Sequence, residues 1–108
     1  MATYLGVDLG ATTIRAVVGD RAGRVVGADR TPTPQGPTGV VITDAVLDTV
    51  RAACADAGVD PEAIVAAGIG AVGPLDRDAG ATVDPANLPG VDRIPLVDPV
   101  ADLIDADR

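Results

Sequence analysis

The first third of the chain alternates hydrophobic and polar positions with the two-residue period of β-strands. Three segments fit strands: residues 3–8, 13–19 and 24–31. Small residues fill the turn between the first two, and Gly23 in the second turn can adopt the positive φ of a tight hairpin. The pattern therefore predicts two successive hairpins, which together form a three-stranded meander.

After a Pro-rich loop, the hydrophobic period lengthens to that of a helix. Thr38 suits an N-cap, the apolar stripe runs to about Ala57, and Gly58 suits the position just past a helix C-terminus. The apolar run 64–70 predicts a buried strand. Because a helix joins this strand to the meander, it should lie parallel to one of the earlier strands.

The remainder of the chain is less regular. Residues 71–90 are rich in Gly, Pro and Asp and predict an irregular excursion that contains one short strand at 81–83. Residues 96–104 predict a last helix. The order of elements indicates an α/β domain built on a mixed sheet.

The strongest chemical signal is Asp8-Leu9-Gly10-Ala11-Thr12-Thr13, where a strand carries a carboxylate directly into a small-residue turn. Backbone N–H groups of such a turn can approach phosphate oxygens because no bulky side chain intervenes. Thr12 and Thr13 add hydroxyl donors, and Asp8 can hold Mg²⁺ through water. On spacing alone, a plain hairpin with a polar turn fits these residues better.

Two further segments carry weaker signals. Gly68-Ile69-Gly70-Ala71-Val72-Gly73 matches the dinucleotide fingerprint, but no helical pattern follows it, so we reject a Rossmann site. Its glycines fit either close backbone packing or a substrate loop. Pro85-Ala86-Asn87-Leu88-Pro89-Gly90 holds Asn87 between two prolines, where its amide suits either a sugar hydroxyl or a simple turn.

Sixteen acidic residues outnumber eight basic ones, all arginine, and give a formal charge of −8. Without a basic face, we expect no nucleic-acid partner. Any phosphate site must act locally, through backbone N–H groups and a bound cation. The acidity fits either an ordinary cytosolic protein or adaptation to high salt, and the absence of Lys beside many Asp, Ala and Val residues favours the second.

Few other residues offer chemistry. Cys54 is the only cysteine, and its place in the helical apolar pattern predicts a buried structural thiol. The absence of His removes the commonest acid–base group and metal ligand. No apolar run is long enough to span a bilayer, and the chain opens on a strand pattern instead of a signal peptide. We therefore expect no membrane partner and a cytoplasmic location.

Taken in order, three segments resemble motifs of the ROK family (repressors, open reading frames and kinases), part of the actin, heat-shock ATPase and sugar-kinase superfamily. Residues 4–16 resemble its first phosphate motif, 68–76 its Gly-rich sugar loop, and 87–90 its Asn-Leu-Pro-Gly segment. The resemblance covers the chain but only the first part of the family's length. It implies an RNase-H-like, actin-like ATPase N-terminal domain, with residues 1–108 forming an incomplete phosphate- and sugar-binding segment.

The resemblance further implies ATP- and Mg²⁺-dependent phosphorylation of a hexose, with glucose the usual substrate. It assigns Asp8 to the metal, the turn Gly10, Ala11, Thr12 and Thr13 to phosphate, and Gly73 and Asn87 to the sugar. The sequence departs from the family at Thr13, where a Lys is often found, and at Val91, where an aromatic residue often stands.

The family's catalytic aspartate, in an Asn-Asp-Ala-Asn-like segment, has no counterpart in this sequence, so no residue is assigned as catalytic. We expect the first segment of a glucokinase-like enzyme, inactive alone. The alternative is a stand-alone phosphate-binding or protein-interaction module. A transcription regulator of the family fits least, since those proteins carry an N-terminal helix-turn-helix.

The same resemblance locates the family's next parallel strand beyond Arg108. The strand predicted at 64–70 should therefore lie at or near a sheet edge. An open apolar edge tends to pair with another chain, so we expect a homodimer or larger oligomer.

If the acidity reflects adaptation to high salt, salt should stabilise the fold. Screening weakens repulsion among the Asp side chains, so Tm should keep rising past about 1 M KCl, where the Debye length is about 3 Å and simple screening is nearly complete. Thermal melts followed by circular dichroism in rising KCl measure this effect. A flat or falling Tm would favour the ordinary acidic protein.

Overall fold

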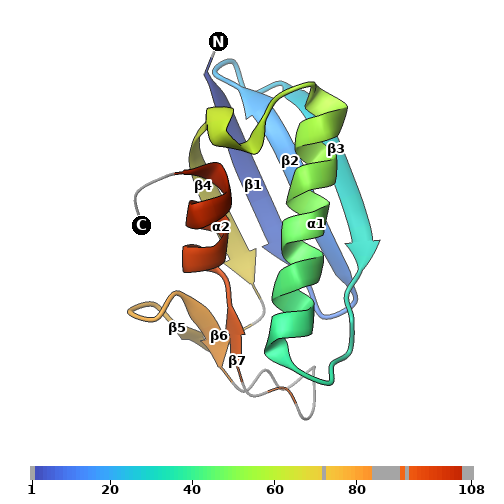
Figure 1. The fold of residues 1–108 in the computed structure, drawn as a ribbon, viewed down its shortest axis with the longest axis vertical. Coiled ribbons are helices and arrows are strands. Elements are labelled where there is room, and N and C mark those ends of the chain that lie inside the picture. Colours follow the sequence, from blue (N-terminus) through green and yellow to red (C-terminus); the bar gives the residue numbers. More distant parts are fainter. Residues whose placement is uncertain (1, 72, 84–90, 92, 106–108) are drawn as a thin grey trace.

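A four-stranded mixed sheet with two helices on one face forms the body of the molecule (Figure 1). The computed structural model describes residues 2–71, 73–83, 91 and 93–105. The sheet consists of β1 (Thr3–Leu9), β2 (Thr13–Asp20), β3 (Val25–Pro32) and β4 (Ile64–Ala71), in the order β3-β2-β1-β4. The meander is antiparallel and β4 is parallel to β1, which confirms both predictions.

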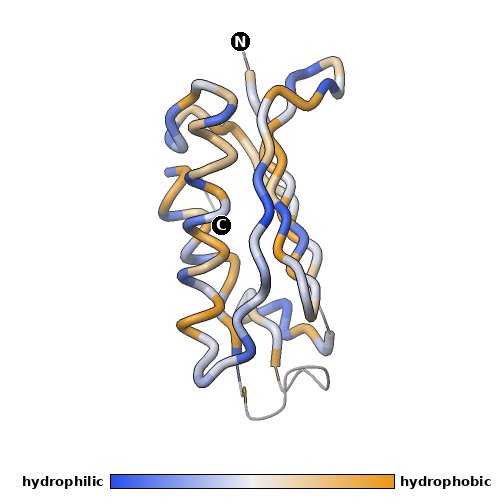
Figure 2. Tube along the Cα trace, turned by 90° about the vertical axis from the view of Figure 1, so that its right-hand side faces the viewer, coloured by the Kyte–Doolittle hydropathy of each residue, from blue (hydrophilic) through white to orange (hydrophobic). Residues whose placement is uncertain are grey.

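The long helix α1 (Gly39–Ala57) packs across the meander and begins and ends where its sequence predicts. The Thr38 hydroxyl accepts a hydrogen bond from the N–H of Val41 at 3.4 Å, and Gly58 adopts a left-handed φ of 71°. The second helix, α2 (Val97–Ile104), lies beside α1 on the same face of the sheet (Figures 1 and 2). Within the described residues, neither helix is long and apolar enough to cross a membrane.

The core fills the space between the helices and the inner face of the sheet. Alternate residues of β1 and β2 are buried there against the apolar stripe of α1, while the residues between them face outward. Cys54 lies in this core, 1% exposed, which confirms the expected buried thiol. Burial raises the pKa of the Cys54 thiol, so the group stays protonated and inert near neutrality.

The excursion after β4 is more ordered than the sequence predicts. It forms a second, antiparallel sheet from β5 (Leu75–Asp76), β6 (Ala81–Val83) and β7 (Arg93–Pro95), in that order. Only β6 was expected, because pairing with β6, and not a period in their own sequence, makes β5 and β7 strands. A hydrogen bond of 2.7 Å from the Thr43 hydroxyl to the Pro95 carbonyl joins this sheet to α1.

Strand β4 lies at the sheet edge, as expected, but the prediction that it is buried is wrong. Ile64 is buried, whereas Val65 is 55% exposed and most of the strand is open to solvent. Among the described residues, no strand pairs with its free side. A groove of about 640 Å³ separates β4 from α2 and is lined by apolar residues that include Ala67, Val100 and Ile104.

This edge predicts self-association. Because β4 carries no charged residue and no proline, Val65→Lys should block pairing by placing a charge on the open strand. Light scattering after gel filtration should find a dimer or larger species for the unmodified chain and a monomer for Val65→Lys. The matched control is Val40→Lys on α1, where the valine is 60% exposed. A strict monomer at high concentration would contradict the prediction.

Candidate functional site

The turn that follows Asp8 lies where β1 and β4 end together. In the parallel register Leu9 pairs with Ala71, so the Gly10–Thr13 turn and the Gly-rich segment after β4 leave the sheet at the same end. The N–H of Gly10 donates to the carbonyl of Thr13 at 3.0 Å and closes the turn. A Cβ on residue 10 would lie 2.9 Å from that carbonyl oxygen, so this tight closure requires glycine.

The loop between β3 and α1 holds the carbonyl groups of this turn. The Thr33 hydroxyl donates to the Gly10 carbonyl at 2.9 Å, and the Thr33 N–H donates to the Thr12 carbonyl at 3.0 Å. The Gln35 amide donates to the Ala11 carbonyl at 3.1 Å. Three successive carbonyls therefore have partners on one side of the turn. We refer to Thr33 and Gln35 as the carbonyl clamp.

With its carbonyls held, the turn retains unused donors. Within the part of the chain that the structure describes, the N–H groups of Ala11 and Thr12 donate no hydrogen bond. Thr12 is exposed, and Ala11 and Thr13 are partly exposed, so an incoming anion can reach this segment. Oriented and unpaired backbone donors on a turn without bulky side chains suit the oxygens of a phosphate group.

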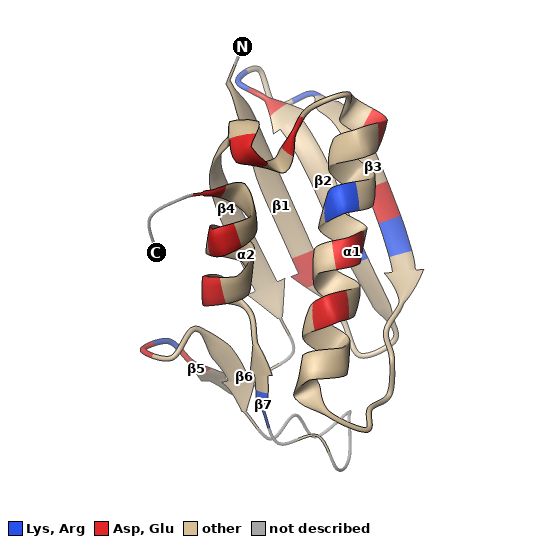
Figure 3. Cartoon of the chain, viewed as in Figure 1, with Lys and Arg blue, Asp and Glu red and all other residues tan. Residues whose placement is uncertain are grey.

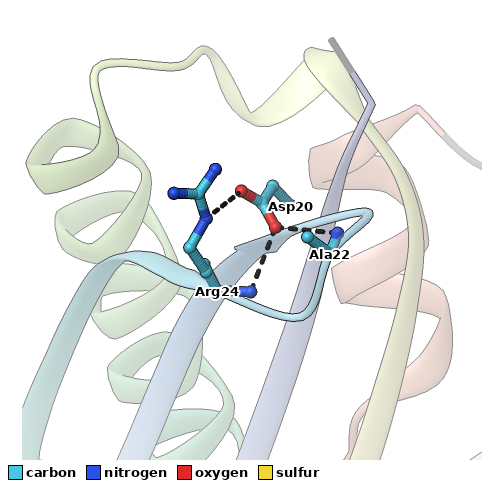
Figure 4. A network of polar contacts seen from close by, with 3 residues as sticks. All are labelled: Asp20, Ala22 and Arg24. Atoms are coloured by element: carbon cyan, nitrogen blue, oxygen red, sulfur yellow. Dashed lines mark hydrogen bonds and ion pairs between the residues drawn. The ribbon is translucent and has the colours of Figure 1, made fainter.

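The hairpin at the opposite end of the meander shows how such donors are satisfied internally. In the β2–β3 turn, the Asp20 carboxylate accepts from the N–H groups of Ala22 at 2.9 Å and Arg24 at 3.0 Å, and from the Arg24 side chain at 3.3 Å (Figure 4). The Arg24 N–H holds the pKa of the Asp20 carboxyl below its ordinary value. The Gly10–Thr13 turn contains no acidic residue to fill this role.

Asp8 lies on the outer face of β1, away from the helices, and its side chain is exposed. Its neighbour in the parallel register is Gly70, and a Cβ built on Gly70 would lie 3.9 Å from the nearer carboxylate oxygen. The described residues hold no group of three or more acidic, Cys or His side chains that could coordinate a metal. A single accessible carboxylate fits Mg²⁺, which keeps several waters and is bound jointly with substrate phosphates.

The predicted sugar residues are only partly described. Gly73 is exposed just past the end of β4, at the same end of the sheet as the turn. The Pro74 carbonyl accepts from the Val83 N–H at 3.0 Å and fixes the segment after Gly73 on the small sheet. Asn87 lies outside the described residues. A strand, β5, and then a turn follow the G-x-G-x-x-G segment where a Rossmann fold has a helix, which confirms the rejection of a dinucleotide site.

The Gly10–Thr13 turn is uncharged, although the chain as a whole is acidic. Acidic residues occur along α1 and α2, whereas the turn at residues 10–13 contains no charged residue (Figure 3). Sequence reasoning located the turn but missed the carbonyl clamp. The sequence predicts a loop at Thr33-Pro34-Gln35, and the only signal for its role is two donor side chains beside prolines that stiffen the backbone.

Comparison with known proteins identifies the family and the fold. The ROK family model matches residues 4–107. Glucokinase of Pyrobaculum calidifontis is 36% identical over 93% of this chain, which covers 29% of that protein. The structures of a ROK family glucokinase from Streptomyces griseus, solved with glucose and AMPPNP, and of a ROK hexokinase from Thermus thermophilus superpose with TM-scores of 0.74 and 0.77.

Both structures match 96% of this chain, at 33% and 32% identity, and the chain covers 31% and 33% of their lengths. The chain thus spans a third or less of each of these relatives. The agreement of the two folds confirms the predicted actin-like ATPase class. On the family match over residues 4–107 and these likenesses, the chain belongs to the ROK family.

Proposed function

We propose that this chain is the phosphate- and sugar-contacting segment of an ATP-dependent hexose kinase. The observation that carries the proposal is the turn at residues 10–13, whose carbonyls are clamped while the N–H groups of Ala11 and Thr12 remain unpaired. Donors held in advance toward a phosphoryl group need no reorganisation when charge develops on its oxygens. The AMPPNP bound by the relative from S. griseus supports ATP as the anion's source.

In this proposal each part of the site has a separate task. Ala11 and Thr12 bind phosphate oxygens through the backbone, and the Thr12 and Thr13 hydroxyls add donors. Asp8 would hold Mg²⁺ through water, and that ion, when bound, neutralises part of the phosphate charge. Thr13 stands where a cationic Lys is common, so the backbone and the metal carry more of the electrostatic work.

The proposed sugar site rests on one described residue, Gly73. Gly73 lies at the same end of the sheet as the turn, and its lack of a side chain leaves room for a sugar close to the backbone. Asn87 is proposed to bind a sugar hydroxyl through its amide. Glucose is the proposed hexose, since the S. griseus structure contains it.

We propose no catalytic base within these 108 residues. Phosphoryl transfer needs a positioned phosphate with its metal, a positioned hydroxyl, and a group that accepts the hydroxyl proton. This chain offers candidates for the first two. The lack of a general base alone lowers the rate by about 10²–10⁴-fold. These 108 residues also lack the groups of a full-length kinase that would orient the two substrates against each other. The alternative is a non-catalytic binding module. It would use the same turn to bind phosphate but would have no catalytic base and no acceptor hydroxyl beside it.

The test of the proposal is binding without turnover. The chain should bind Mg-ADP and lose about tenfold or more of that affinity, together with its Mg²⁺ dependence, in Asp8→Asn, because the charge that holds the ion is removed. In a coupled assay with glucose, mannose and N-acetylglucosamine, no hexose-dependent ADP formation should appear. Asp44→Asn, on α1, is the matched control.

Absence of Mg-ADP binding at any salt concentration would contradict the phosphate turn. Robust turnover that disappears in Asp8→Asn would show that the chain contains a proton acceptor after all. If the chain binds hexose but no nucleotide, the proposed sugar-binding role is supported and the proposed kinase function is rejected.

The carbonyl clamp yields a separate prediction. Thr33→Val keeps the shape of a side chain that is 5% exposed but removes its hydrogen bond to Gly10, which should cost about 1–2 kcal/mol of unfolding free energy. Because the turn loses one of its fixed carbonyls, Mg-ADP affinity should fall as well. Urea melts and calorimetric titration measure the two effects.

Thr49→Val is the matched control for this experiment. Its buried hydroxyl bonds to the Ala45 carbonyl and to the Thr31 hydroxyl, and to no group of the turn or of the carbonyl clamp. It should lose comparable stability while binding Mg-ADP normally. Equal affinity losses in the two variants would mean that the clamp acts only through global stability.

A further inference from the structure

Three charged residues form a row across the outer face of the sheet. In the antiparallel registers Asp8 of β1 is directly opposite Arg15 of β2, and Arg15 is directly opposite Arg30 of β3. All three side chains are exposed. The two arginines border a shallow depression of about 400 Å³, which is also lined by Ala16, Val17, Ala28 and one acidic residue, Asp29.

Like charges directly opposite each other on neighbouring strands destabilise a sheet. Within the described residues, neither Arg15 nor Arg30 forms an ion pair, and the same holds for Arg21 and Arg77, whereas Arg24, Arg51 and Arg93 each have a carboxylate partner. Arg15 and Arg30 differ from Arg21 and Arg77 in being directly opposite each other on neighbouring strands. Asp8 is opposite Arg15 on the other side, but no described carboxylate forms an ion pair with either arginine, so the repulsion between them is only partly offset. A bound anion between the two guanidinium groups would remove the repulsion.

The pair is also close to the proposed phosphate turn. Thr13 precedes Arg15 by two residues on the same strand and therefore points to the same face of the sheet. Arg15 is therefore the next residue after Thr13 on this face, and it is directly opposite Asp8 on the neighbouring strand. Arg30 lies one strand further, about 5 Å away along the row.

We propose that Arg15 and Arg30 form a phosphate-binding pair that extends the Gly10–Thr13 turn across β2 and β3. Guanidinium groups bind phosphate through paired, charge-assisted hydrogen bonds. The phosphate belongs either to the nucleotide seated at the turn or to a free phosphate ion. The first source rests on the proposed function, and the second does not.

The experiment compares three probes: Mg-ATP, Mg-ADP and inorganic phosphate, at constant ionic strength, by calorimetry and ³¹P NMR. Arg15→Gln and Arg30→Gln should each weaken phosphate binding about tenfold, the contribution of a charge-assisted hydrogen bond. Arg21→Gln, in the β2–β3 turn at the far end of the same strand, is the control with the same change in net charge. It should bind all probes as the unmodified chain does.

Thermal melts without phosphate supply a second readout. Arg30→Gln relieves the Arg–Arg repulsion and leaves Arg15 opposite Asp8, so its Tm should stay the same or rise. Added phosphate should raise the Tm of the unmodified chain more than that of either variant. Weakening of Mg-ATP alone assigns the pair to the nucleotide, and weakening of inorganic phosphate alone assigns it to a free ion. Affinities equal to those of Arg21→Gln for every probe would overturn the inference.

The two proposals fail in different ways. If Asp8→Asn abolishes Mg-ADP binding while the arginine variants bind every probe normally, the proposed kinase function is supported and the proposed arginine pair is rejected. If the unmodified chain binds no nucleotide but binds inorganic phosphate through Arg15 and Arg30, the pair stands and the proposed function fails. If the unmodified chain binds none of the three probes, both fail.

Discussion

The Gly10–Thr13 turn owes its chemistry to the carbonyl clamp. A short hairpin turn has as many acceptors as donors, and it attracts an anion only when the acceptors point elsewhere. Thr33 and Gln35 bind the carbonyls of Gly10, Ala11 and Thr12 from the β3–α1 loop. The donors of Ala11 and Thr12 are left for a ligand. The β2–β3 turn, where the Asp20 carboxylate occupies the corresponding donors, shows the same chemistry satisfied from within.

The rest of the fold brings partners to this turn. The parallel pairing of β1 with β4 brings Gly70 beside Asp8 and carries the chain to Gly73 at the same end of the sheet. The antiparallel pairing of β2 with β3 aligns Arg15 and Arg30 on the outer face, while α1 and α2 cover the inner face. One face of the sheet is thus used for stability, and the other is free for charged groups.

Periodic features of this fold could be predicted from sequence, and features that depend on distant contacts could not. The meander, α1 with its Thr38 cap, and the parallel β4 follow from hydrophobic period and end signals. The prediction that β4 is buried was wrong because an apolar run does not reveal whether a neighbouring strand covers it. Strands β5 and β7 were missed because pairing with β6, not their own sequence, makes them strands.

The candidate site divides in the same way. Asp8 and the turn could be found as a local motif, and the family resemblance supplied their roles. The carbonyl clamp depends on hydrogen bonds between residues 21 to 24 positions apart, and the arginine row depends on strand register. Neither leaves a local pattern in the sequence, since any loop can contain Thr and Gln and any strand can contain Arg.

Amide chemical shifts of the ¹⁵N-labelled chain, recorded while Mg-ADP is added, show which backbone donors bind phosphate. We expect the N–H signals of Ala11 and Thr12 to show the largest downfield shifts, because these donors gain a phosphate acceptor. The amides of Ala22 and Arg24, already bonded to Asp20, should stay in place. If the largest shifts occur in the groove between β4 and α2 while Ala11 and Thr12 stay unchanged, the Gly10–Thr13 turn is not the phosphate site.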